Sequence, residues 1–202
     1  MNYRQPWHTL DIDISNALRK DLDLDEMYRE SEFNGQPIGV WYYMTEHLDQ
    51  LLNPAWLDHA HSINFPVISA MVFYRDPYYL HPGAHVDLFW DGTPCVSAIN
   101  WVLDPKDDSK MVWYDVPNDT GQLLITPAGT KYLHWDTDTV ENHVLDQRCI
   151  ANQPTVVRVG IPHNVIVNSR PRWVISLRLD RKKFSATTWE ETVDQLKPFI
   201  VE

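Results

Sequence analysis

The sequence predicts a mainly β domain with flanking helices, a double-stranded β-helix (jelly roll) supported by N-terminal helices. Two observations lead to this fold class. Short apolar and β-branched runs recur between residues 66 and 180, and turn sequences such as Asp91-Gly92-Thr93-Pro94 separate them. The helical patterns gather before residue 66 instead of alternating with the strands. Closely spaced strands are typical of sandwiches and barrels, and about seven or eight of them suit an eight-stranded jelly roll.

The first 65 residues carry most of the expected helices. Trp7 to Ile14 alternates apolar and polar residues and predicts a short strand. Three helical stretches are expected after it: residues 15–30 with Ser15 as N-cap, Val40 to Leu52 ended by Asn53-Pro54, and a shorter turn at Ala55 to His61.

The strands of the predicted core share apolar and β-branched residues between turn signals. They are expected at Val67 to Tyr74, Leu80 to Leu88, Val96 to Leu103, Met111 to Val116, Gln122 to Thr126, Thr130 to Trp135, Thr155 to Val167 (a strand or strand pair interrupted at Pro162) and Trp173 to Leu179. Residues 136–153 are polar and expected to be irregular, and a helix is expected at Trp189 to Leu196. We interpret residues 1–202 as one domain, with support at 1–65, the core at 66–180 and a tail at 181–202.

Composition narrows the class of partner and the compartment. The formal net charge of −11 disfavours a broad surface for polyanions, so nucleic acid is not an expected partner. Two cysteines make no disulfide framework. The first residues lack the apolar stretch of a signal peptide, and no run has the length of a membrane helix. We therefore expect a soluble cytoplasmic protein, with the oligomeric state left open.

The motif His85-Val86-Asp87 follows a Pro-Gly turn and lies in a predicted strand. Side chains two positions apart on a strand lie on the same face of the sheet, so the imidazole and the carboxylate can bind one metal ion. His163, 78 residues later, is the best candidate for a third ligand, because four or five strands fit between. Two histidines and one carboxylate with open positions opposite are the ligand set of non-haem iron(II) oxygenases.

The same spacing occurs twice more and predicts no metal site there. His47 and Asp49 fall in an expected helix, where side chains two positions apart point to roughly opposite faces. His134 and Asp136 end a strand and are separated from His163 mostly by loop, so we interpret them as surface or pocket-rim residues.

The remaining histidines are weaker candidates. His59 and His61 resemble a zinc-type pair, but their short helical or irregular stretch favours ordinary surface residues. His81, before the Pro-Gly turn, is at most a pocket residue.

An arginine near His163 would extend the metal site to a 2-oxo acid. Such an acid can bind iron through its keto oxygen and adjacent carboxylate, and the far carboxylate of 2-oxoglutarate then needs a buried cation. Arg172 follows His163 by nine residues, and a short turn between antiparallel strands would bring it back to that histidine. Arg170 belongs to the turn before Pro171, and Arg178 lies further along the strand.

The order of these motifs resembles the iron(II)/2-oxoglutarate-dependent oxygenases, in particular the prolyl-4-hydroxylase-like branch. The resemblance covers about residues 66–180 and rests on Tyr74, Pro82-Gly83, His85-Val86-Asp87, Cys95 to Trp101, His163 and Arg172. It implies iron(II) at His85, Asp87 and His163, with 2-oxoglutarate at Arg172. Asn100 stands where the family often has a tyrosine hydroxyl for the far carboxylate, and Tyr74 resembles another pocket tyrosine. Trp113 is a further candidate for the pocket lining, or equally a core aromatic.

The resemblance also implies a reaction. 2-Oxoglutarate and dioxygen would be converted to succinate and carbon dioxide while a C–H bond of a peptide or small polar substrate is hydroxylated. The residues leave two alternatives open: a cupin-like metal enzyme that does not use 2-oxoglutarate, and a non-enzymatic jelly-roll binding module.

Overall fold

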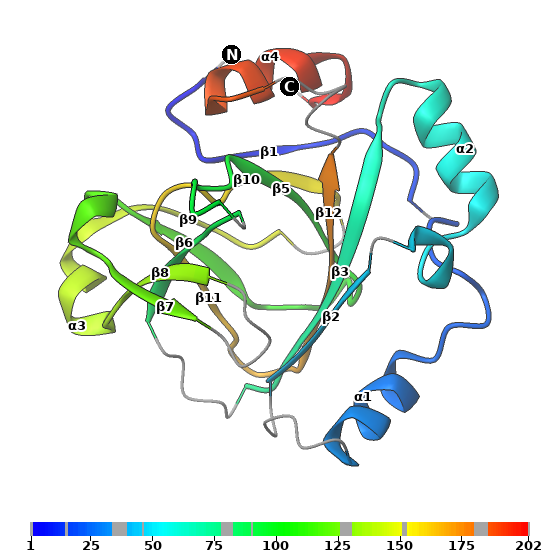
Figure 1. Cartoon of the computed structure of the whole chain (residues 1–202), viewed down its shortest axis with the longest axis horizontal. Coiled ribbons are helices and arrows are strands. Elements are labelled where there is room, and N and C mark those ends of the chain that lie inside the picture. Colours follow the sequence, from blue (N-terminus) through cyan, green and yellow to red (C-terminus); the bar gives the residue numbers. More distant parts are fainter. Residues whose placement is uncertain are drawn as a thin grey trace.

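Two antiparallel sheets form the body of the protein (Figure 1). The computed structural model describes residues 2–14, 16–33, 40–45, 47–77, 83–89, 91–125, 131–150, 153–179 and 186–201. The first sheet contains, in spatial order, β1 (Trp7–Thr9), β10 (Thr155–Arg158), β5 (Ser97–Val102), β12 (Arg172–Leu179), β3 (Val67–Arg75) and β2 (Val40–Thr45). The second contains β7 (Gln122–Ile125), β8 (Lys131–Trp135), β4 (Ala84–Asp87), β11 (His163–Ile166), β6 (Lys110–Tyr114) and β9 (Val144–Arg148).

The helices lie outside the two sheets (Figure 1). They are α1 (Leu24–Phe33), α2 (Pro54–Ser62), α3 (Thr137–Val140) and α4 (Trp189–Leu196). The chain also forms four 3-10 turns among the described residues, η1 (Leu48–Gln50), η2 (Asn118–Thr120), η3 (Glu141–His143) and η4 (Lys197–Phe199). Helix α4 begins with a capping box between Thr188 and Glu191, and the two chain ends lie beside it. The helix expected at Trp189 to Leu196 is confirmed.

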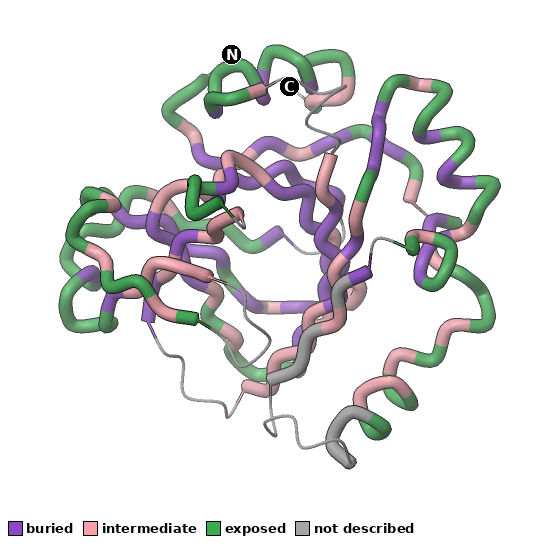
Figure 2. The backbone as a smooth tube through the Cα atoms, viewed as in Figure 1, coloured by how far each residue is buried: buried purple, intermediate pink, exposed green. Residues whose placement is uncertain are grey.

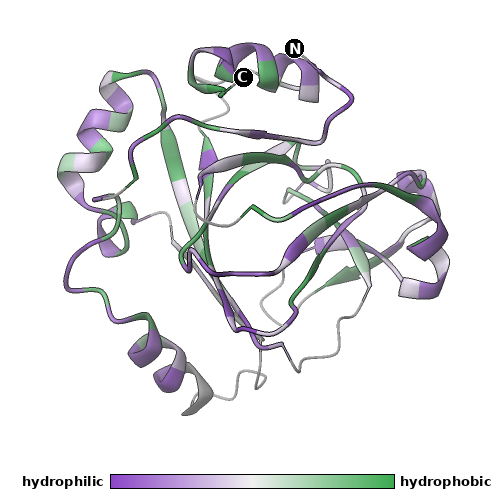
Figure 3. Ribbon diagram, turned by 180° about the vertical axis from the view of Figure 1, so that it is seen from behind, coloured by the Kyte–Doolittle hydropathy of each residue, from purple (hydrophilic) through white to green (hydrophobic). Residues whose placement is uncertain are grey.

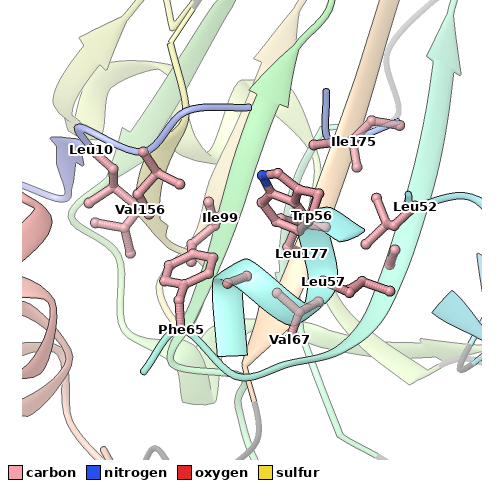
Figure 4. Close-up of a cluster of buried hydrophobic side chains, with 14 of the residues drawn as sticks. Leu10, Leu52, Trp56, Leu57, Phe65, Val67, Ile99, Val156, Ile175 and Leu177 are labelled. Carbon is pink, nitrogen blue, oxygen red and sulfur yellow. The ribbon is translucent and has the colours of Figure 1, made fainter. Parts of the chain in front are cut away.

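Three clusters of buried hydrophobic residues form the core. One cluster lies between the sheets and includes Val102, Trp113 and Val174. A larger cluster lies between the first sheet and the N-terminal segment, where Trp56 of α2 packs toward Leu177 of β12 (Figure 4). A third covers the outer face of the second sheet beneath α3. Buried backbone concentrates in the strands in Figure 2, and Figure 3 shows hydrophobic residues along the same strands.

The mainly β fold with supporting helices agrees with the sequence prediction, and twelve strands are described where seven or eight were expected. The prediction of a helix at Val40 to Leu52 is wrong, because its aromatic and β-branched start pairs with β3 along the edge of the first sheet. The N-terminal support therefore contributes β1 and β2 as well as helices.

Two further boundaries differ from the prediction. The helix expected at 15–30 begins only at Leu24, because Leu18 pairs with Leu52 in an isolated bridge that holds the chain extended there. Ser15, its expected N-cap, lies outside the described residues. Residues 136–153 are not irregular throughout: they form α3, η3 and the edge strand β9, whose mostly polar, exposed side chains hid the strand pattern.

Within the described part of the chain, no helix is long and apolar enough to cross a membrane. The cytoplasmic location stays a prediction.

Candidate metal centre

Two neighbouring strands of the second sheet bring three predicted ligands together. His85 and Asp87 alternate with the buried Ala84 and Val86 on β4, so both point to the side opposite the outer core cluster. His163 is the first residue of β11 and stands directly opposite His85 in the antiparallel register. The fold thus places all three side chains on the face of the second sheet that looks toward the first.

The spacing of the donor atoms suits a single metal ion. One donor atom from each of His85, Asp87 and His163 lies within 4.8 Å of the other two. His85 Nε2 is 3.7 Å from Asp87 Oδ1, too far for a hydrogen bond, and the two imidazole ring centres are 4.4 Å apart. The side chains of His85 and Asp87 remain 28% and 30% exposed while His163 is buried, so the group is open on one side.

The two imidazoles are in the neutral form that metal binding requires. His163 Nδ1 lies 3.0 Å from the carbonyl oxygen of Ile161. A carbonyl only accepts, so the hydrogen bond places the proton on Nδ1 and leaves the Nε2 lone pair for a metal. Burial lowers the pKa of His163, and burial together with the neighbouring His163 lowers the pKa of His85 to about 3. Both imidazoles are therefore neutral near pH 7, as ligation requires.

Asp87 is held from the opposite sheet. Arg178 Nη2 donates to Asp87 Oδ2 at 2.9 Å, and Arg178 Nη1 donates to Ser176 Oγ at 2.9 Å. Burial alone would raise the pKa of Asp87, but the charge and hydrogen bond of Arg178 together with the two histidines outweigh burial, and the pKa lies below its usual value. Arg178, expected only to lie further along the strand, shares its face with Arg172 because the two positions differ by an even number.

Arg172 faces the same space between the sheets from the beginning of β12. It is only 5% exposed, and its Nε atom is buried without a hydrogen-bond partner. Burial lowers the pKa of its guanidinium to about 10, and the charge of Asp107 offsets a part of that effect. No ion pair to Arg172 occurs among the described residues, so Asp107 offsets the cost of burying the positive charge only in part.

Asn100 lies between the sheets but is not opposite Arg172. Its register partner on β12 is Ser176, four residues from Arg172 and about 13 Å along a strand. Asn100 Nδ2 contacts Met111 Sδ at 3.9 Å, and its buried Oδ1 has no hydrogen-bond partner. The structure therefore does not pair this amide with the arginine.

Tyr74 lies on the other face of the first sheet. Its ring packs against Tyr28 of α1 and Trp173, with centroid distances of 4.3 and 4.8 Å. Its neighbour Arg75 instead reaches across to the second sheet, where Nη1 donates to the carbonyl of Val165 at 2.9 Å. The predicted pocket tyrosine is thus a packing residue beneath α1, on the side away from the metal ligands.

Of the two other predicted pocket residues, Trp113 and His81, the structure describes only Trp113. Trp113 stands opposite His163 on β6, is fully buried, and donates from Nε1 to the carbonyl of Arg158 at 2.8 Å. It is a core residue that backs the histidine. His81 lies outside the described residues.

Strand β8 lies next to β4 and borders the metal ligands. His134 stands directly opposite His85, and Tyr132 directly opposite Asp87. The charge of a protonated His134 would help to lower the pKa of His85, which indicates that the two imidazoles are close. Both β8 residues thus border the metal group, and the register alone, which the sequence did not give, reveals them.

Gly83 fixes the start of β4. Its φ of +109° suits glycine, and a Cβ at this position would lie 2.0 Å from the carbonyl oxygen of Trp135. The contact sets how closely β4 approaches β8 immediately before His85.

Comparisons with known proteins give limited information. No family model matches the chain, and no curated protein is similar to it. A solved structure of a Pseudomonas putida prolyl-4-hydroxylase is similar at 11% sequence identity and a TM-score of 0.35, with 87% of this chain and 93% of that chain covered. A likeness at this level does not assign the chain to a family.

Proposed function

We propose that the protein is an iron(II)/2-oxoglutarate-dependent dioxygenase that hydroxylates a peptide or a small polar molecule. The observation that carries the proposal is that a candidate metal site and a buried arginine face the same space between the two sheets. The second sheet presents two neutral imidazoles and a carboxylate as a metal site, and the first sheet presents a buried guanidinium that forms no ion pair among the described residues.

The ligand set supports iron(II). His85, His163 and Asp87 supply two imidazole nitrogens and a carboxylate oxygen, which is the set used by non-haem iron(II) oxygenases. When bound, the metal supplies the chemistry that converts 2-oxoglutarate and dioxygen to succinate and carbon dioxide and hydroxylates a C–H bond. The protein's own contribution is to hold, orient and shield the reactants.

Arg172 supports a dicarboxylate cosubstrate. A buried cation without a partner is costly, and a ligand carboxylate bound by the guanidinium would remove that cost. In our proposal Arg172 binds the far carboxylate of 2-oxoglutarate, while the core around Trp113 keeps water from the inner side of the metal site. Tyr74 is not part of the proposed site, and no contact from Asn100 to the cosubstrate is included.

The strand order supports a double-stranded β-helix. From β3 to β6, successive strands alternate between the two sheets. Strands β3, β12, β5 and β10 are neighbours in one sheet, and β4, β11, β6 and β9 in the other. We propose that this winding is a jelly roll with β1 and β2 added to one sheet and β7 and β8 to the other.

Anaerobic titration with iron(II) and 2-oxoglutarate tests the proposal. We expect a visible charge-transfer band with the wild type, its loss in His163→Ala, and a weaker affinity for 2-oxoglutarate in Arg172→Met with metal binding retained. Metal binding without a band at millimolar 2-oxoglutarate would favour a cupin-like enzyme of other chemistry. Absence of metal binding would favour a binding module.

A further inference from the structure

We propose that Arg178 is a positioning residue that holds Asp87 as a one-oxygen metal ligand. The proposal rests on the metal site of the proposed function and does not depend on 2-oxoglutarate. It starts from the separate surroundings of the two Asp87 oxygens. Oδ2 accepts from Arg178 Nη2 at 2.9 Å, while Oδ1 is the oxygen 3.7 Å from His85 Nε2.

The division of the carboxylate has a consequence for coordination. With Oδ2 engaged by a charged donor, Oδ1 is the oxygen available to a metal shared with the histidines. A second metal–oxygen bond from Asp87 would take one of the positions that a chelating cosubstrate and dioxygen need. Arg178 therefore sets both the direction of the ligand and the number of open positions.

Arg178 is itself restrained. Its side chain is 17% exposed, and Nη1 donates to the hydroxyl of Ser176, which is buried two residues earlier on the same face of β12. The guanidinium is thus fixed at two points, one on each sheet. A planar, permanently charged group held in this way can fix the rotation of the carboxylate, which a flexible ammonium group does less well.

The contact is more than a surface ion pair. Arg170 and Asp104 form such a pair at 3.0 Å, but the arginine side chain is 48% exposed there and the carboxylate binds no candidate metal. Arg170 provides a matched control, because its substitution removes an arginine from an ion pair at the other end of β12 without touching the metal ligands.

Cobalt(II) binding tests the proposal, with visible absorption as the readout. Outer hydrogen-bond partners of metal ligands typically contribute 10- to 100-fold to affinity, so we expect Arg178→Met to weaken cobalt binding by about that factor. At saturating cobalt its absorption band should also change shape, because the carboxylate no longer binds in one orientation. Arg178→Lys should recover part of the affinity, Ser176→Ala should show a smaller loss in the same direction, and Arg170→Met should bind like the wild type.

Each result is decisive. If Arg178→Met lowers the melting temperature but keeps the cobalt affinity and band of the wild type, the contact only stabilises the fold and the proposal fails while the metal site stands. If Arg178→Met does not fold, Arg178→Lys and Ser176→Ala give the same decision. A wild type that binds cobalt but shows no 2-oxoglutarate band refutes the proposed function and leaves the role of Arg178 intact. A wild type that binds no cobalt refutes both.

Discussion

Replacing Arg172 by methionine should make the metal-free protein more stable. Arg172 is 5% exposed, and burial lowers the pKa of its guanidinium from the ordinary value to about 10. That lowering corresponds to roughly 3 kcal/mol against the charged form in the folded state. Methionine keeps much of the side-chain volume without the charge. Allowing for imperfect packing, we expect the free energy of unfolding to rise by roughly 1 to 3 kcal/mol at pH 7.

Urea unfolding of the metal-free proteins measures this difference. Wild type, Arg172→Met and the control Arg170→Met are compared at the same pH and salt concentration. The control removes an exposed arginine of the same strand region, so its stability should change far less. Added 2-oxoglutarate and manganese(II) should raise the melting temperature of the wild type and of the control, but the rise caused by 2-oxoglutarate should be much smaller for Arg172→Met.

A less stable Arg172→Met would refute the reasoning. That result would mean that the buried guanidinium makes stabilising contacts in solution. No bound anion would then be needed to offset the cost of burying its charge. Equal stabilisation of both proteins by 2-oxoglutarate would separately remove Arg172 from the cosubstrate site.

Three other predictions test the parts of the fold that hold the site. Gly83→Ala should lower stability by at least about 2 kcal/mol, because the new Cβ meets the Trp135 carbonyl; Gly92→Ala, also at positive φ but with open space, should cost only about 1 kcal/mol, as urea midpoints would show. Trp113→Ala should cost about 3 to 5 kcal/mol as a core cavity, and calorimetry showing less than about 1 kcal/mol would contradict its burial. Acidification should destabilise the metal-free protein between the ordinary histidine pKa of 6.5 and about 3, since the unfolded chain protonates before the folded His85 does. His85 contributes at most about 1.4 kcal/mol per pH unit to the slope of the unfolding free energy against pH. This contribution should be absent from the unfolding curves of His85→Gln.

The metal group could be predicted because strand alternation is a strong local rule. His85 and Asp87 share a face in any register of their strand, and His163 begins another short apolar run. The same rule puts Arg178 on the face of Arg172, but its role at Asp87 was not predicted, because that contact joins residues 91 positions apart.

Other features depended on packing that the sequence does not specify. Tyr74 and Arg75 are adjacent, so a shift of one residue decides which of them faces the interior, and the sequence prediction chose the tyrosine. Strand β2 was predicted as a helix because its identity as a strand comes from pairing with β3. The position of His134 directly opposite His85 could not be predicted, because the neighbour relation between β8 and β4 is a tertiary one.

The single register pair between His85 and His163 has a consequence for the way the protein opens. It is the pairing that joins β4 to β11 in the described structure, so the second sheet consists of two three-stranded halves that meet at the two imidazoles. A metal ion bound there would link the two halves, because β4 and β11 would both contribute ligands to it. Without it, amide hydrogen exchange should be fastest along this seam, while β5 and β12 exchange slowly, and added metal should slow exchange there more than elsewhere.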